Sequence, residues 1–94
     1  MIIENPTYSI EELNILEKKV INNLAEIKDY EKIDSILNSM GFNNIIKDKM
    51  REFNINSYSE YLLERRIKKM DIAAITGTIL GVIAALKKIL TNKI

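Results

Sequence analysis

The sequence predicts an all-α protein, a small bundle of four to five helices in a single domain, 1–94. Apolar residues recur at intervals of three and four along almost the whole chain, as one face of a helix requires, and strand-like alternation is nowhere sustained. Helix start and stop signals divide this periodicity into segments, and no Pro/Gly/Ser-rich linker separates them. The balance of 47% hydrophobic and 29% charged residues is that of an ordinary folded chain.

The first helix is expected to begin at Ser9, after an extended segment, 1–8. Ser9 and Glu12 form a Ser-x-x-Glu capping box, in which each side chain accepts a hydrogen bond from a backbone N–H at the helix start. Apolar residues then follow at helical spacing for about five turns. They are Ile10, Leu13, Leu16, Val20, Leu24 and Ile27. We interpret Leu13, Val20 and Leu24 as the stripe that faces the last helix.

Two shorter helices are predicted in the middle of the chain. One covers 31–40 and ends at Gly41, because glycine readily adopts the left-handed conformation that closes a helix, and Phe42 can then pack back on that helix. The next helix has Asn43 as its cap and a turn after it at 54–56. Its inner side carries Ile45, Ile46, Met50 and Phe53.

A fourth helix is expected to begin at Ser57, which repeats the capping-box pattern with Glu60. Its core contacts are Tyr58, Tyr61, Leu62 and Ile67. We interpret the four tyrosines of the chain as boundary residues whose rings pack while their hydroxyls reach water. Asp71 leaves two alternatives: as an N-cap it starts a separate last helix, and otherwise the fourth helix continues through it.

The last helix, predicted over 71–91, is the most informative stretch. It is apolar from Ile72 to Leu86, and its small residues recur at every fourth position, which aligns them on one side of a helix. These small residues, called the ridge below, are Ala73, Gly77, Gly81 and Ala85. The bulk beside the ridge comes from Ile75, Ile79, Val82 and Leu86. Two glycines in a helix interior cost about 1 kcal/mol each relative to alanine, so the ridge predicts a close-packed partner.

Three environments fit the ridge. In the first, another helix of the same chain crosses it inside a soluble bundle. In the second, the ridge binds a second copy or another helical protein, because small residues let helix backbones approach closely. In the third, the helix enters a membrane. Its fifteen apolar residues span about 22 Å at 1.5 Å each, less than a hydrocarbon core about 30 Å thick, so a full span is marginal.

Charge is unevenly distributed along the chain, although the net charge is +1. Residues 1–40 carry eight acidic and four basic side chains, and residues 41–94 carry five acidic and ten basic. Either the acidic first helix lies across the basic last helix, or the basic half attracts an anionic partner. In the second case the expected phosphate contacts are Arg65, Arg66, Lys68, Lys69, Lys87 and Lys88. A small nucleic-acid-binding regulator is therefore one alternative function.

Active-site chemistry is not expected in this chain. It contains no Cys and no His, which removes the thiolate nucleophile, the usual general base and the commonest metal ligand. No Gly-rich phosphate loop or metal-ligand spacing occurs, and Ser9 and Ser57 are explained as caps. We therefore predict a non-enzymatic protein without catalytic, cofactor-binding or metal-binding residues.

The function predicted from these observations is self-assembly or partner binding through the ridged last helix, with a homo-oligomer as the expected form. A membrane-active protein of the lysis, pore or viral coat type is the other alternative. We expect a cytoplasmic protein, because the N-terminus lacks the basic and long apolar regions of a secretory signal, with membrane association as the minority interpretation. Eighteen Ile, eleven Lys and ten Asn are typical of an AT-rich genome, such as that of a low-GC bacterium, an archaeon or a phage or other virus of either.

Overall fold

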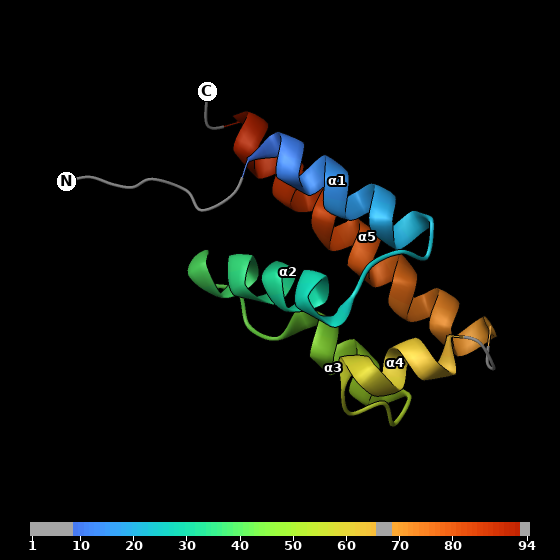
Figure 1. Cartoon of the computed structure of the whole chain (residues 1–94). Helices are drawn as coiled ribbons and strands as arrows, with labels where there is room; N and C mark the ends of the chain where they lie inside the picture. The colour runs from blue at the N-terminus through green and yellow to red at the C-terminus, as the bar shows by residue number, and fades with distance from the viewer. Residues whose placement is uncertain (1–8, 66–68, 93–94) are drawn as a thin grey trace.

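A computed structural model describes residues 9–65 and 69–92 of the chain. Within these ranges the protein contains five α-helices and no strand, which confirms the predicted all-α fold (Figure 1). The helices are α1 (Ile10–Ile21), α2 (Ile27–Ser39), α3 (Ile45–Glu52), α4 (Tyr58–Glu64) and α5 (Lys69–Asn92).

The first and last helices lie side by side and run in opposite directions, so that the start of α1 is next to the end of α5 (Figure 1). Helices α3 and α4 also contact α5, and α2 packs against α4. The longest helix therefore runs through the whole bundle and is the common support of the shorter ones.

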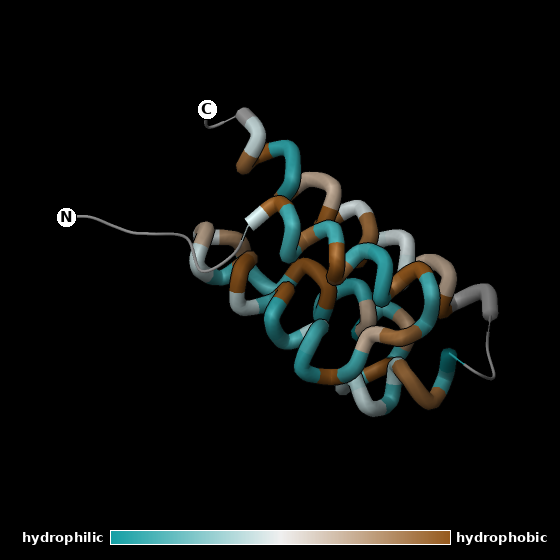
Figure 2. The backbone as a smooth tube through the Cα atoms, turned by 45° about the horizontal axis from the view of Figure 1, so that its top comes forward, coloured by the Kyte–Doolittle hydropathy of each residue, from teal (hydrophilic) through white to brown (hydrophobic). Residues whose placement is uncertain are grey.

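One continuous core joins the five helices. Large aliphatic side chains from α1 and α5 form part of it, and aromatic and aliphatic side chains from α2, α3 and α4 form the rest. The fully buried members include Leu13, Val20, Tyr30, Ile33, Ile46, Met50, Tyr61, Ile75, Ile79, Ile83 and Leu86. Figure 2 shows hydrophobic and hydrophilic residues alternating along α1, whereas α5 is hydrophobic to neutral until its C-terminal end.

Three consecutive helices end in the same way. The residue after the cap has a left-handed backbone at Asn23 (φ 65°), Gly41 (φ 86°) and Asn54 (φ 62°). In each case the next residue's N–H donates back across the last turn, as in a Schellman motif: Leu24 to the Lys19 carbonyl at 2.7 Å, Phe42 to Leu37 at 3.0 Å, and Ile55 to Met50 at 3.0 Å. The sequence predicted this kind of helix end at Gly41. The two asparagines adopt the same conformation because Asn tolerates it better than other residues with a side chain.

The turn at Asn23 corrects the predicted length of the first helix. Helix α1 ends at Ile21, and the chain reverses before Leu24, which is 68% exposed. Leu24 is therefore not part of the stripe that faces α5, although Leu13 and Val20 are. Ile27 begins α2 instead of closing α1.

The helix starts are partly as predicted. The hydroxyls of Ser9 and Ser57 accept hydrogen bonds from the backbone N–H three residues later, at 3.2 Å and 3.1 Å, which confirms both caps. Helix α2 starts four residues before the predicted position, because Asp29 accepts a hydrogen bond from the Glu26 N–H at 2.8 Å and closes a capping box there. The N-cap of α3 is Asn44, one residue beyond Asn43.

The last helix begins before Asp71. Because α5 is already helical at Lys69, Asp71 is not its N-cap, which excludes the first of the two alternatives. Helix α4 ends at Glu64 and α5 is a separate element, so the fourth helix does not continue through Asp71 either. The predicted core residue Ile67 and the predicted extended segment 1–8 lie outside the described residues.

Candidate interface on helix α5

The two predicted sides of the last helix have opposite environments in the folded chain. The bulky residues Ile75, Ile79, Val82 and Leu86 are all buried in the protein's own core. The ridge residues Ala73, Gly77, Gly81 and Ala85 are all exposed, and so are Ala74 and Ala84 beside them. Helix α5 therefore has large aliphatic side chains on its buried side and small residues on its exposed side.

The two glycines of the ridge have no neighbour within the described part of the chain. A Cβ atom placed at Gly77 or Gly81 would meet nothing within 4 Å. The expectation that another helix of this chain crosses the ridge is thus not met there. The exposed face is also uncharged from Ile72 to Leu86, a distance of about four turns.

The length and composition of α5 also satisfy the requirements of a membrane span. A stretch of 20 residues, Ile72–Thr91, is long and apolar enough, and 33% of it is buried inside the protein. Core helices of soluble proteins satisfy the same requirements, so this property alone is weak evidence for a membrane location.

The basic residues predicted to contact phosphate do not form one patch within the described residues. Arg65 donates hydrogen bonds to the Tyr30 hydroxyl at 3.0 Å and the Val20 carbonyl at 2.8 Å, so its guanidinium fastens α4 to α1 and α2. Lys87, near the other end of α5, binds Glu17 at 2.8 Å and Asn14 at 3.0 Å. Lys88 is exposed.

The remaining three basic residues are not placed in the same detail. Lys69 is the first residue of α5, and Arg66 and Lys68 lie outside the described residues. The contact between Lys87 and Glu17 is an ion pair of the kind expected if the acidic first helix lies against the basic last one. Among the described residues, the other ion pairs of α1 go to α2 and are described next.

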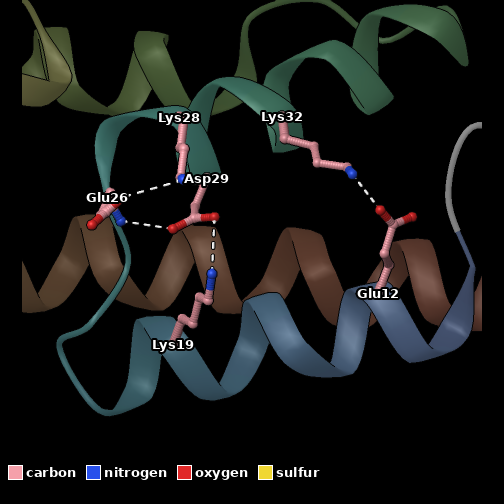
Figure 3. Close-up of polar contacts among 6 residues, drawn as sticks. All are labelled: Glu12, Lys19, Glu26, Lys28, Asp29 and Lys32. Carbon is pink, nitrogen blue, oxygen red and sulfur yellow. Dashed lines mark hydrogen bonds and ion pairs between the residues drawn. The ribbon is translucent and has the colours of Figure 1, made fainter.

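Charged side chains also connect α1 with α2 at two points (Figure 3). Glu12 pairs with Lys32, and Lys19 lies 3.5 Å from Asp29, which at the same time caps the start of α2. The Glu12–Lys32 pair is exposed, and a pair of this kind contributes about 0–1 kcal/mol, whereas Asp29 of the other pair is buried. The two contacts together fix the direction in which α2 crosses α1.

A buried polar corner joins α2, α3 and α4, and no motif or spacing in the sequence predicted it. The Asp34 carboxylate accepts a hydrogen bond from the Tyr58 hydroxyl at 2.5 Å and lies 3.9 Å from the Lys47 ammonium. Its other oxygen, Oδ1, is buried and has no hydrogen-bond partner within the described part of the chain. Burial raises the pKa of Asp34 above its usual range, and the contacts with Tyr58 and Lys47 oppose this shift only in part.

The tyrosines correct the prediction that their hydroxyls reach water. Tyr30, Tyr58 and Tyr61 are buried, and Tyr30 stacks on Tyr58 with ring centroids 5.1 Å apart. The Tyr61 hydroxyl lies 2.6 Å from that of Thr76 on α5. Burial raises the pKa of both Tyr30 and Tyr58, so these phenols stay neutral at physiological pH. The fourth, Tyr8, lies outside the described residues.

An apolar groove opens beside the C-terminal end of the ridge. It lies between the end of α2, the α2–α3 connection and the last turns of α5, and it holds about 90 Å³ of accessible space. Its walls are Leu37, Phe42, Ile45, Val82, Ala85, Leu86 and Ile89. Ala85 belongs to both features, so the ridge leads into the groove.

Neither metal-binding chemistry in the described residues nor a comparison with known proteins identifies a further site. No three carboxylates gather into a potential metal site in residues 9–65 and 69–92. The chain matches no model of a known protein family, no curated protein and no solved structure. The candidate site is therefore the exposed face of α5.

Proposed function

We propose that this protein acts by association rather than by chemistry, and that the ridge of α5 binds the ridge of a second copy. The observation that carries the proposal is the open space over Gly77 and Gly81. Each glycine costs about 1 kcal/mol of helix stability relative to alanine, and no contact within the described chain offsets that cost. Close packing against another helix offsets it, because the helix backbones approach each other where side chains are smallest.

The chemistry of the exposed face supports a helical partner. Ala73, Gly77, Gly81 and Ala85 present a smooth, uncharged surface without long side chains that must be ordered on binding. Burial of this surface removes apolar area from water, and no charged group within it needs to be desolvated.

The spacing of the ridge supports a second copy as that partner. In an antiparallel pair related by a two-fold axis near Ile79, Ala73 of one chain faces Ala85 of the other, and Gly77 faces Gly81. The helix dipoles are then opposed, which is favourable. The two Lys88 side chains lie at opposite ends of the contact, whereas a parallel pair would bring them together.

The test is the oligomeric state of the parent and of Gly77→Leu and Gly81→Leu, measured by sedimentation equilibrium. We expect the parent to be a dimer and both variants to be monomers. The variants should keep their helical circular dichroism, because a side chain at either position meets open space within its own chain. Ser35→Leu is the control, since Ser35 is exposed on α2, and it should leave the dimer intact. A monomeric parent, or variants that dimerise like the parent, would contradict the proposal.

Lipid is the second candidate, favoured by the 20-residue apolar stretch Ile72–Thr91. At 1.5 Å per residue it covers about 30 Å, which matches the hydrocarbon core. Insertion would have to separate Lys87 from Glu17 and remove the bulky side of α5 from the core. Flotation of detergent-free protein with liposomes separates the two candidates. A dimer that stays in the aqueous fraction supports the association proposal, and a chain that floats with the vesicles supports the lipid alternative.

A further inference from the structure

A polar pocket lies among α2, α3 and the start of α4, and no residue of α5 lines it. It holds about 220 Å³ of accessible space. Because a water molecule takes about 30 Å³ of liquid volume, this space suits one molecule of about seven non-hydrogen atoms. The pocket is separate from the ridge, so its role does not depend on the association proposed above.

Two side chains of opposite charge line the pocket from different helices. Glu31 comes from α2 and Lys47 from α3, and they do not pair with each other. Glu31 has no ion-pair or hydrogen-bond partner within residues 9–65 and 69–92. Lys47 lies 3.9 Å from Asp34, which is too long for a hydrogen bond. The carboxylate oxygens of Glu31 and the N–H groups of Lys47 are therefore available to a bound molecule.

The two charges also lie close to the same buried group. Besides burial, which raises the pKa of Asp34 most, the Lys47 ammonium lowers that pKa and the Glu31 carboxylate raises it. Both charges therefore act at short range on one carboxylate, although they come from different helices and form no direct pair. The pocket holds a positive and a negative group a short distance apart.

The rest of the lining adds neutral polar groups and one aliphatic wall. The side chains of Asn56 and Ser59 form no hydrogen bond within the described part of the chain. The Ser57 hydroxyl accepts a hydrogen bond from the Glu60 N–H at 3.1 Å and retains its own proton for donation. Ile27 is 38% exposed and offers an apolar surface.

We propose that this pocket binds a compact zwitterion of the α-amino acid class. Its ammonium pairs with Glu31, its carboxylate pairs with Lys47, and a small apolar side chain packs on Ile27. A purely cationic molecule would be repelled by Lys47 and a purely anionic one by Glu31, whereas a zwitterion complements both charges. Exposed ion pairs are weak, so we expect half-saturation on the order of 1–10 mM.

Titration of the full chain with three related probes tests the proposal, with backbone amide chemical shifts in a two-dimensional NMR spectrum as the readout. L-alanine carries both charges, L-alaninamide only the positive one and N-acetyl-L-alanine only the negative one. We expect L-alanine to shift the amides of Lys47, Asn56 and Ser59 in a saturable way. The two singly charged probes should bind at least about fivefold more weakly, because each lacks one charge-assisted hydrogen bond.

Two variants assign the two ends of the probe. Glu31→Gln should weaken L-alanine at least about fivefold and leave N-acetyl-L-alanine unchanged, because that probe has no ammonium group. Lys47→Met should weaken L-alanine and leave L-alaninamide unchanged. The matched controls are Glu11→Gln and Lys18→Met, at exposed positions on α1 outside the pocket, and they should bind L-alanine like the parent.

Three outcomes would overturn the proposal. Shifts that rise linearly with L-alanine, without saturation across the expected range, would mean that the pocket binds no zwitterion. Equal half-saturation for L-alanine and either singly charged probe would reduce the site to a contact with one charge. Equal losses in the pocket variants and their controls would mean that binding is unspecific. A monomeric parent protein would contradict the association proposal and leave this one unaffected.

Discussion

Two regions of this bundle are stabilised by different chemistry. Where α1 packs on α5, the buried contacts are aliphatic, through residues such as Leu13, Val20 and Ile79, and the Lys87–Glu17 pair lies at the edge. Where α2, α3 and α4 meet, the contacts are aromatic and polar, with Asp34 and Tyr58 buried together. The first region depends on shape and volume, and the second also depends on the protonation state of one carboxylate.

The largest effect is expected in the aliphatic region. Ile79→Ala should lower the free energy of unfolding by about 2–5 kcal/mol, because Ile79 is fully buried and its truncation leaves a cavity between α5 and its neighbours. Urea denaturation measures the change. The control is Ile15→Ala on α1, the same truncation at a side chain that is 55% exposed, with an expected change within about 0.5 kcal/mol. Similar losses for both variants would mean that the aliphatic contact is not where the structure places it.

The contribution of the polar corner to the free energy of unfolding should depend on pH, whereas that of the aliphatic region should not. Because burial raises the pKa of Asp34 in the folded state, the folded protein holds this proton more tightly than the unfolded chain. The resulting stability is fully present below the usual pKa of 3.8 and is lost as pH rises through the raised value. Asp34→Asn removes this titration, so the stability of the variant relative to the parent should increase between pH 3.5 and pH 7.

Denaturant titrations of both proteins across this pH range give the difference directly, and subtraction cancels the other carboxylates. Asp48→Asn, at an exposed carboxylate on α3, is the matched control. A difference between Asp34→Asn and the parent that does not change with pH would show that the Asp34 proton is not linked to folding.

The smallest effect is expected on the outer side of α5. Gly77→Ala should raise the free energy of unfolding of the monomer by about 0.5–1 kcal/mol, because alanine is the better helix former and its methyl group meets open space. Urea denaturation at a concentration where the protein is monomeric measures this gain. A loss of stability would mean that another part of the chain covers Gly77.

The features that the sequence predicted are those set by neighbouring residues. Ser9, Ser57 and Gly41 act within one helical turn, so their roles as caps and stop follow from local spacing. Leu24 was misassigned because its spacing continues the stripe of α1, whereas Asn23 turns the chain one residue earlier. Periodicity describes which residues share a side of a helix only as far as the helix extends.

The residues of the candidate site were predicted, but their exposure on the surface of the bundle was not. The small residues of α5 were identified from their spacing, yet spacing cannot distinguish a ridge inside the bundle from one on its surface. Phe42 and Ile45 were expected to pack inward but line an open groove, each 41% exposed, and the buried Asp34 was not singled out, for a related reason. Their surroundings come from helices that are distant in sequence, and no local pattern records which helix ends meet.

The repeated helix ends at Asn23, Gly41 and Asn54 have a consequence for the rate of folding. Each of these turns is closed by hydrogen bonds that span at most five residues, so α1, α2 and α3 can form and reverse direction without distant contacts. The pairing of α1 with α5 is different, because it joins the two ends of the chain and must close a long loop. We therefore expect the docking of α5 onto α1 to be the slow step of folding, preceded by rapid formation of the three local turns.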